Sequence, residues 1–127
     1  MTIDQILKDK GFAIISVKAG ETLAAAAQTL DGKRIGAVVA LDDDGGIIGV
    51  LSERDIVRHV ARQGAMALNL NVGDAMTRDV IKVESTSKID DALQLMTDRR
   101  IRHLPVMNDG KLVGVISIGD LVKWKIA

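Results

Sequence analysis

A serine and an aspartate three residues apart occur twice in this chain, each time after a glycine and two apolar residues. The copies are Gly49-Val50-Leu51-Ser52-Glu53-Arg54-Asp55 and Gly114-Val115-Ile116-Ser117-Ile118-Gly119-Asp120. An aspartate carboxylate can accept two hydrogen bonds from a vicinal diol, and a serine hydroxyl beside it can bond to a sugar or a phosphate. The repeated pair therefore suits a ribonucleotide.

The same spacing also has a purely structural explanation. Ser-x-x-Asp before an apolar helical run is a capping-box pattern, and an aspartate at a strand-to-helix turn is a good N-cap. Taken locally, the pattern favours two helix caps over a binding site. The two roles are compatible, because backbone N–H groups and the helix dipole at such a junction favour anionic oxygens.

The elements that must position these residues are predicted from apolar runs, capping patterns and turn residues. Each half of the chain reads strand, helix, strand, strand, helix. In the first half we expect them at 13–17, 21–30, 35–41, 47–51 and 55–63, and in the second at 80–83, 87–99, 104–107, 112–118 and 120–124. A capped helix is expected over 1–10, a helical turn over 72–76, and hairpin turns at 42–46 and 108–111.

The two halves align as an internal repeat. Val17 corresponds to Val83 and Arg34 to Arg100, 66 positions apart, and the offset becomes 65 after the first turn, which is one residue longer. Repeats of roughly 50–60 residues bury little core alone, so we expect their sheets to pack together. The predicted fold is α+β, with two βαββα repeats related by pseudo-twofold symmetry. The predicted domains are repeat 1 over 1–64, a linker over 65–71 and repeat 2 over 72–127.

Composition excludes several classes of function. Lys and Arg number 17, as do Asp and Glu, and aromatic residues make up 2% of the chain, which counts against nucleic-acid binding. The chain has no cysteine and two histidines, so thiolate chemistry and a histidine-only three-ligand metal site are excluded. No serine–histidine–acid set is apparent either. We expect a soluble cytoplasmic protein that does not associate with membranes, is not an enzyme, and uses no metal or catalytic cofactor.

Single residues outside the motif have simpler explanations. The sole proline, Pro105, lies in an apparent strand and predicts an edge or strand-start position. Arg99 and Arg100 are expected to face water at a helix C-terminus. His59 is expected at the surface. Asp42–Asp44 lacks the spacing of a calcium loop and is expected to form a turn.

The order and spacing of several phrases resemble those of a tandem pair of CBS domains, the module named after cystathionine β-synthase. Besides the repeated motif, these phrases are Ile6-Leu7-Lys8-Asp9-Lys10-Gly11, Asp74-Ala75-Met76-Thr77 and Arg100-Ile101-Arg102-His103-Leu104-Pro105-Val106. The resemblance covers essentially the whole chain and identifies it as similar to small stand-alone members of that family.

The resemblance implies binding of an adenosine compound in the cleft between the repeats: AMP, ADP or ATP, or NAD or S-adenosylmethionine. It assigns the ribose to Asp120 with Ser117 and to Asp55 with Ser52. Adenine would contact strand backbone and aliphatic side chains, which suggests Val80, Ile81 and Ile116 for one site and Ile14, Ile15 and Leu51 for the other. Arg102, His103 and Arg54 are candidates for phosphate, and Thr77 and Pro105 complete the expected site.

The function expected from these observations is regulatory. Ligand binding would change the conformation, which an unidentified protein partner would read. Two copies of such modules commonly form a homodimer, here through the helices that begin near Asp55 and Asp120. Two alternatives remain open: a structural or oligomerisation module without a ligand, and, less favoured by the composition, a nucleic-acid-binding module.

Overall fold

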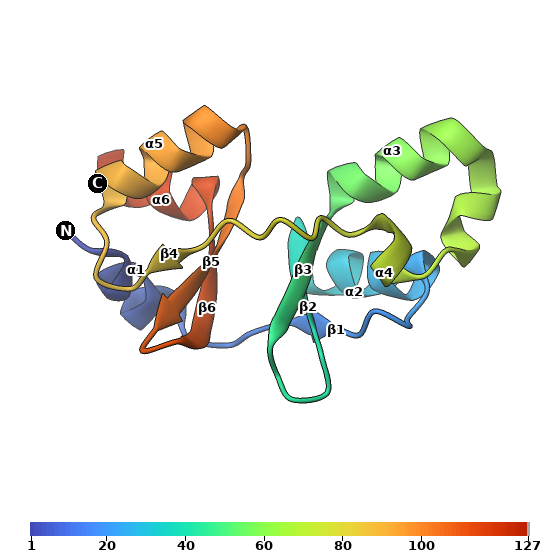
Figure 1. Cartoon of the computed structure of the whole chain (residues 1–127). Helices are drawn as coiled ribbons and strands as arrows, with labels where there is room; N and C mark the ends of the chain where they lie inside the picture. Colours follow the sequence, from blue (N-terminus) through green and yellow to red (C-terminus); the bar gives the residue numbers. More distant parts are fainter. Residues whose placement is uncertain (127) are drawn as a thin grey trace. The chain divides into compact units, whose positions relative to one another are not determined.

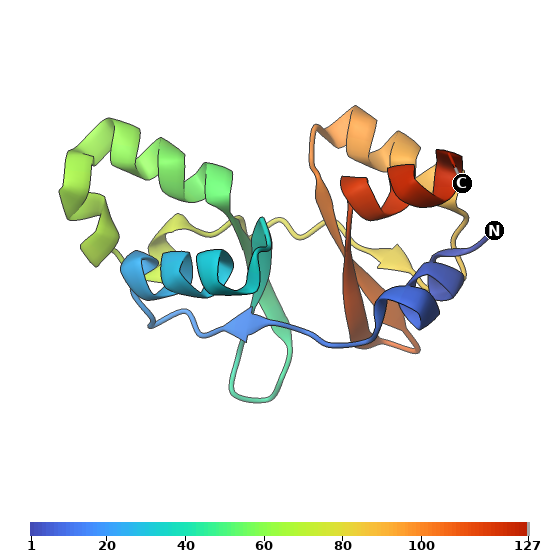
Figure 2. The ribbon, with the colours of Figure 1, turned by 180° about the vertical axis from the view of Figure 1, so that it is seen from behind.

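The computed structural model describes residues 1–126 and divides them into two compact units. The repeat-1 unit is Ile15–Val80, and the repeat-2 unit combines Met1–Ile14 with the chain from Ile81 onward. Figures 1 and 2 show each unit as a small sheet with helices. The α+β class and the order strand, helix, strand, strand, helix in each repeat are as predicted.

The helices and strands have the following bounds. In the repeat-1 unit they are β1 (Ser16–Val17), α2 (Leu23–Lys33), β2 (Ala37–Leu41), β3 (Ile47–Ser52), α3 (Glu53–Gln63), the 3₁₀ helix η1 (Gly64–Asn69) and α4 (Val72–Ala75). In the repeat-2 unit they are α1 (Ile3–Lys10), β4 (Val83–Glu84), α5 (Ile89–Arg99), β5 (His103–Asn108), β6 (Lys111–Ser117) and α6 (Ile118–Ile126).

The two three-stranded sheets have the same topology, β1-β2-β3 and β4-β5-β6, with one parallel and one antiparallel pair each. Their antiparallel registers are interrupted at equivalent places, between Ala40 and Leu41 and between Val106 and Met107. The repeat seen in the sequence is therefore a repeat of strand register.

The expectation that Pro105 lies at a sheet edge is wrong, because its strand, β5, is the middle strand of the sheet. Val39, its counterpart in repeat 1, pairs with Ser16 of β1. In repeat 2 the parallel ladder starts only at Val83 and Val106, one residue beyond the proline. Because proline has no N–H to donate, β4 begins where its partner strand can pair again.

Each unit has its own hydrophobic core, formed by one face of its sheet and by its helices. In the repeat-1 unit the buried residues come from β1–β3, α2, α3 and α4; they include Val38, Leu51, Leu23, Ala26 and Val72. In the repeat-2 unit they come from β4–β6, α1, α5 and α6; they include Leu104, Ile116, Leu7, Met96 and Leu121.

Helix α1 belongs to the second core although it starts the chain. Ile3, Ile6 and Leu7 are buried there, and the amides of Ile3 and Asp4 donate to the carbonyls of Ser87 and Ser85 at 2.9 and 2.8 Å. The predicted capping box is present, with Thr2 N donating to Gln5 Oε1 at 2.9 Å. The N-terminal helix, counted with repeat 1 from sequence, thus packs on repeat 2.

Several element ends differ from the prediction. Strands β1 and β4 are two residues long, against five and four expected. Residues 64–69, expected within a linker without regular structure, form η1, and Leu68 and Leu70 pack on the first core. Lys88, rather than the predicted serine, is the N-cap of α5.

Both hairpin turns form as predicted. In the first, Asp42 Oδ1 accepts hydrogen bonds from the amides of Asp44 and Gly46 at 2.9 and 2.8 Å. In the second, Asp109 and Gly110 both have positive φ, at 52° and 76°, between the paired residues Asn108 and Lys111. Two consecutive positive φ values are what a two-residue hairpin of the favoured twist requires.

Candidate functional site

Both serine–aspartate pairs form capping boxes at a strand-to-helix junction. Ser52 Oγ accepts from the Asp55 amide at 3.2 Å, while Asp55 Oδ2 accepts from the Ser52 amide at 2.9 Å. The corresponding distances for Ser117 and Asp120 are 3.1 and 2.8 Å. The helices begin earlier than predicted, so in the first motif the serine is the N-cap and the aspartate the third helical residue.

Asp55 is held entirely within its own repeat. Its Oδ2 also accepts from Ser52 Oγ at 3.2 Å, and its Oδ1 accepts from Arg58 Nη2 at 2.7 Å. Its side chain is only 6% exposed. A ligand that used this carboxylate would have to displace a charge-assisted hydrogen bond formed one turn away on the same helix.

Asp120 has a different cation and a different exposure. Lys10, the last residue of α1, places Nζ 2.7 Å from Asp120 Oδ2 and 2.8 Å from the carbonyl oxygen of Val115. The Asp120 side chain is 25% exposed, and the bonds from Lys10 Nζ and the Ser117 amide both end on Oδ2. Arg58 has Lys123 as its counterpart in repeat 2, and Lys123 lies exposed to solvent.

These contacts shift the ionisation of Asp120. Partial burial by itself raises the pKa of this carboxyl, but hydrogen bonds from Lys10 and Ser117 and the charge of Lys10 outweigh it. The net result is a pKa below the ordinary aspartate value. Asp120 is therefore a fixed anion at a helix N-terminus, with a cation beside it.

The glycine that opens each motif makes room for a neighbouring helix. A Cβ on Gly114 would lie 2.7 Å from Leu7 Cδ2 of α1, and one on Gly49 would lie 2.5 Å from Met76 Sδ, just after α4. Both contacts are closer than a real Cβ tolerates. The motif glycine thus lets α1, with Lys10 at its end, approach β6.

The candidate phosphate residues lie near their motifs within each unit. His103 is paired with Ser117 across β5 and β6, and the carbonyl of Arg102 accepts from the Ile118 amide at 2.8 Å. Arg102 is exposed and His103 partly buried. Arg54 is exposed in the first turn of α3. The structure therefore brings Arg102, His103, Ser117 and Asp120 together in the repeat-2 unit, with Arg54 beside Asp55 in the other.

The residues expected to contact adenine fall into two groups. Ile116 and Leu51 are fully buried in the two cores, so only their strand backbone is available for the expected contact with adenine. The four others, Ile14, Ile15, Val80 and Ile81, are partly buried and lie in loops before β1 and β4. Pro105 is buried, and Thr77 is exposed and bridged to Val50 through both backbone amides at 2.9 Å.

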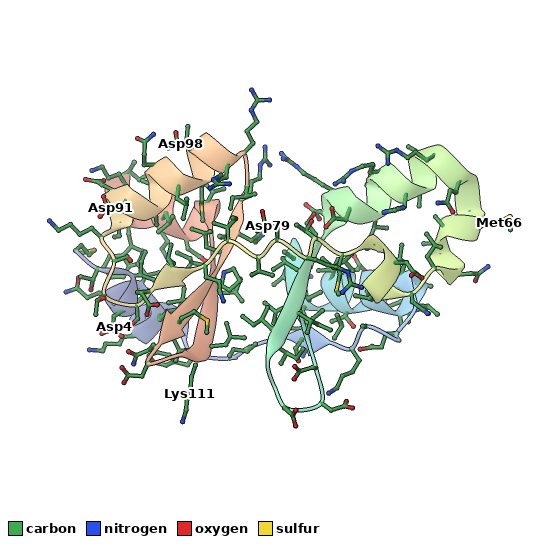
Figure 3. All side chains as sticks on the ribbon, in the orientation of Figure 1. Asp4, Met66, Asp79, Asp91, Asp98 and Lys111 are labelled. Atoms are coloured by element: carbon green, nitrogen blue, oxygen red, sulfur yellow. The ribbon has the colours of Figure 1, made fainter. Side chains whose placement is uncertain are left out.

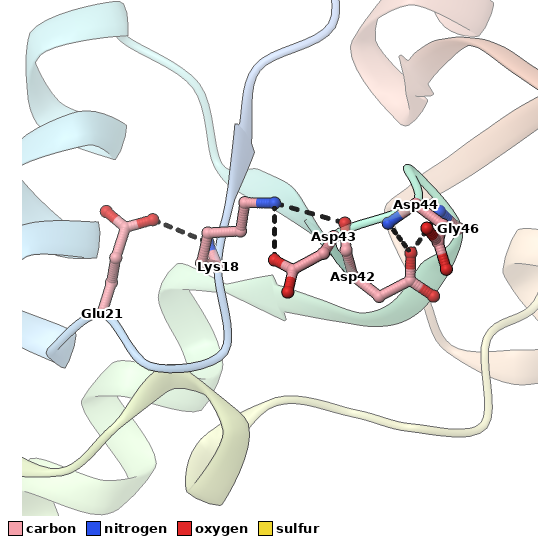
Figure 4. A network of polar contacts seen from close by, with 6 residues as sticks. All are labelled: Lys18, Glu21, Asp42, Asp43, Asp44 and Gly46. Atoms are coloured by element: carbon pink, nitrogen blue, oxygen red, sulfur yellow. Dashed lines mark hydrogen bonds and ion pairs between the residues drawn. The ribbon is translucent and has the colours of Figure 1, made fainter.

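Two further groups of polar side chains lie outside the motifs. Figure 4 shows that the acidic turn is a hydrogen-bonded structure, with Lys18 Nζ 3.5 Å from Asp43 Oδ1 and 3.2 Å from the Asp42 carbonyl. Within residues 1–126, no group of three or more acidic or histidine side chains is placed to hold a metal ion. His59, expected at the surface, is partly buried, and its Nδ1 is buried without a hydrogen-bond partner in the described chain.

Lys10 is the site residue that sequence reasoning missed. It is separated from Asp120 by more than a hundred residues, and no local pattern relates the two. The only trace in the sequence is its place in the family-like phrase that ends at Gly11. Arg58, by contrast, could have been found, since an aspartate and an arginine three residues apart on a helix are neighbours.

The fold and the paired motifs define a class of protein: tandem α+β repeats, each with a serine–aspartate capping pair at a strand-to-helix junction. The chain belongs to the CBS-domain family, because the sequence profile described as CBS domain matches residues 11–62 and 72–127. The resemblance predicted from the sequence is confirmed. Paired CBS domains are generally regulatory modules.

Individual relatives support this assignment. CBS domain-containing protein CBSX3, mitochondrial, of Arabidopsis thaliana is 34% identical over 130 residues, which cover 96% of this chain and 63% of that protein. The chain spans about three fifths of the length of the curated relatives it matches. The CBS-domain containing protein ATU1752 of Agrobacterium tumefaciens has a crystal structure with a TM-score of 0.96 and 41% identity, covering 98% of this chain and 99% of that one.

A more distant structure was solved with ligands. The CBS domain pair of protein MJ0100, in complex with 5′-methylthioadenosine and S-adenosyl-L-methionine, has a TM-score of 0.87 at 21% identity, covering 98% of this chain and 95% of that one. At this identity the likeness shows a shared fold. No helix within residues 1–126 combines the length and the apolar character needed to cross a membrane.

Proposed function

We propose that this chain is a regulatory module that binds an adenosine compound and catalyses no reaction. The candidate ligands are AMP, ADP, ATP, NAD and S-adenosylmethionine. The observation that carries the proposal is the state of Asp120, a partly exposed carboxylate fixed as an anion by its capping box and by Lys10. A carboxylate held in this way is already ordered as an acceptor for ribose hydroxyls, and its Oδ1 takes part in neither of these two bonds.

The motif of repeat 2 is the better ribose site of the two. Both oxygens of Asp55 accept hydrogen bonds from its own repeat, and its side chain is almost inaccessible. The protein bonds to Asp120 end on Oδ2, and neither of them uses Oδ1. Arg102 and His103 stand beside Ser117, where a phosphate attached to the ribose could be bound.

The ligands of MJ0100 support the ligand class. Both 5′-methylthioadenosine and S-adenosyl-L-methionine contain adenosine, and they are bound by a CBS domain pair with this fold. For the present chain the choice among adenosine compounds is a proposal. The regulated protein partner is likewise proposed only as a class, a protein that reads a ligand-dependent conformation. The ligand can shift that conformation only by its difference in affinity for the two states.

Isothermal titration calorimetry of the full chain against these five compounds tests the proposal. We expect at least one to bind, Asp120→Ala to abolish the binding, and Asp55→Ala to weaken it less. Asp91→Ala, which removes an exposed aspartate on α5, is the matched control. Circular dichroism checks that each variant is folded. Absence of binding by all five compounds, or equal affinity in Asp120→Ala, would overturn the proposal and leave the motif as a helix cap alone.

We further propose that the protein is a homodimer. Helix α6 exposes Ile118, Val122 and Ile126 at successive four-residue intervals, and α3 exposes Val57 and Val60. Residues so spaced share one helix face. Exposed apolar faces of this kind mark sites of protein association. These faces lie on the helices from which the dimer was expected.

A further inference from the structure

Lys10 is held on the Asp120 carboxylate by helix α1, which lies outside the motif. Its Nζ donates to Asp120 Oδ2 at 2.7 Å and to the Val115 carbonyl at 2.8 Å. Helix α1 is anchored by Leu7 against Gly114 and by buried Ile3 and Ile6. The packing of α1 therefore places Lys10 beside the motif, and the position of the lysine does not depend on its ion pair with Asp120 alone.

The lysine ammonium has three hydrogens, and the two described bonds use two of them. The third can be donated to an oxygen of a bound molecule. At the same time, the ammonium occupies one of the carboxylate positions that ribose hydroxyls would use. An uncharged ribonucleoside that displaced it would break a charge-assisted hydrogen bond and gain no anion to pair with the lysine.

We propose that Lys10 determines the charge specificity of the repeat-2 site, selecting adenosine compounds that carry a phosphate over uncharged ones. This inference rests on the proposed function, since it names the residue that sets ligand class at the same site. An anionic ligand can form a new ion pair with Lys10 in place of the hydrogen bond to Asp120, whereas a neutral nucleoside cannot. Lys10 thus lowers the affinity for uncharged nucleosides and raises the affinity for nucleotides.

The cation beside the motif aspartate differs between the two repeats. In repeat 1 the cation beside Asp55 is Arg58, which sits in the same helix and is paired with the carboxylate at 2.7 Å. In repeat 2 the corresponding residue, Lys123, is exposed, and the cation comes from α1. The two motifs therefore carry the same capping box with differently supplied cations, and only the second places a lysine there.

The test compares AMP with adenosine as calorimetric probes of the wild-type chain and of Lys10→Met. We expect the ratio of the two affinities to fall about tenfold in Lys10→Met, because a charge-assisted hydrogen bond is worth about that factor. Lys8→Met is the matched control, since Lys8 lies on the same helix in an exposed pair with Asp4. It should leave the ratio unchanged, and Lys10→Arg should preserve most of it.

The outcomes separate this inference from the proposed function. If wild type binds AMP and the ratio in Lys10→Met equals that of wild type, the specificity role is wrong while the proposed function stands. If wild type binds no adenosine compound at all, both are wrong. If Lys10→Met does not fold by circular dichroism, Lys10→Gln, which keeps a hydrogen-bond donor and removes the charge, gives the same comparison with the same expected fall.

Discussion

The two aspartates show how one four-residue pattern acquires two different roles. Each accepts the same capping hydrogen bond from its serine amide, at 2.9 and 2.8 Å. The difference lies in the cation, supplied by Arg58 from the same helix in one case and by Lys10 from a separate helix in the other. Asp55 is thereby closed within its repeat, whereas Asp120 remains open to an additional donor.

The lowered pKa of Asp120 leads to a prediction about stability and pH. Its folded-state pKa lies below the unfolded value, so the ionised carboxylate stabilises the folded state at neutral pH, and this contribution is lost as the pH falls through the folded pKa. Asp120→Asn should therefore lower the free energy of unfolding by about 1 kcal/mol at neutral pH. The difference from wild type should shrink progressively below about pH 4.

Urea denaturation of both proteins over a pH series measures this difference. Asp91→Asn, an exposed position outside the motif, serves as the control. A gap between wild type and Asp120→Asn that stayed constant down to acid pH would show that the carboxylate charge does not stabilise the fold. Added salt should reduce the gap, since the Lys10 pair is partly exposed.

The sequence predicts contacts between residues that are only a few positions apart. The capping boxes and the acidic turn follow from residues within a few positions of one another, and both formed as expected. The pairing of Lys10 with Asp120 depends on where α1 packs, which no local pattern encodes. The full burial of Ile116 and Leu51 likewise depends on which sheet face meets the core, and strand alternation alone does not tell this.

Among the elements, α1 is the one that links packing to the candidate site. Leu7 is completely buried and fills the space that the absent Cβ of Gly114 leaves. Lys10 follows Leu7 by three residues, so it lies on the same side of the helix. Any change that moves Leu7 is therefore expected to move the cation at Asp120.

A double-mutant cycle tests this coupling. We expect Leu7→Ala to lower the free energy of unfolding by about 3 kcal/mol through the cavity it leaves. Gly114→Ala should lower it by about 2 kcal/mol through overpacking against Leu7. In the double variant the new methyl group occupies part of the cavity, so the loss should be smaller than the sum by about 1 kcal/mol.

Chemical denaturation of the four proteins gives the coupling energy. The matched control combines Leu7→Ala with Gly49→Ala. Gly49 is the equivalent glycine of repeat 1, and its neighbour is Met76. That pair should be additive, because its residues lie in different cores. Additivity in the Leu7 and Gly114 pair would contradict the proposed contact between α1 and β6.

Helices and hairpins were predicted more closely than the first strand of each repeat. Helix patterns depend on the chain itself, so α3 and α5 ended at or close to the expected residues. The apolar runs at 13–17 and 80–83 favour strands, yet a strand exists only where a neighbour offers backbone groups. Pro105 removes one such group, and β4 accordingly starts at Val83.

For the molecule as a whole, the repeats in the sequence and the compact units in space are not the same segments. The first fourteen residues pack with the second repeat, so each unit is completed by a short helix that comes just before the first strand of the other unit. Helix α1 precedes β1 in the chain and packs on repeat 2, and α4 precedes β4 and packs on repeat 1. The unit that holds the Asp120 motif is therefore complete only with the N-terminal segment, which carries Lys10.

We expect the molecule to associate into a homodimer. The apolar faces of α3 and α6 remain exposed, with Val57 65% and Ile126 80% accessible, and Met66 extends away from η1 (Figure 3). Covering such faces removes apolar surface from water, at about 25 cal/mol per Å². We expect wild type to sediment as a dimer, and both Val57→Asp and Val122→Asp to shift it to the monomer without loss of secondary structure.

Sedimentation velocity over a series of concentrations makes the measurement. Lys123→Asp, which introduces the same side chain next to Val122 at an already exposed polar position, controls for a general effect of charge. It should leave the dimer intact because it removes no apolar surface. A monomeric wild type at every concentration, or a dimer that both valine variants leave unchanged, would show that these helix faces do not bind a second copy.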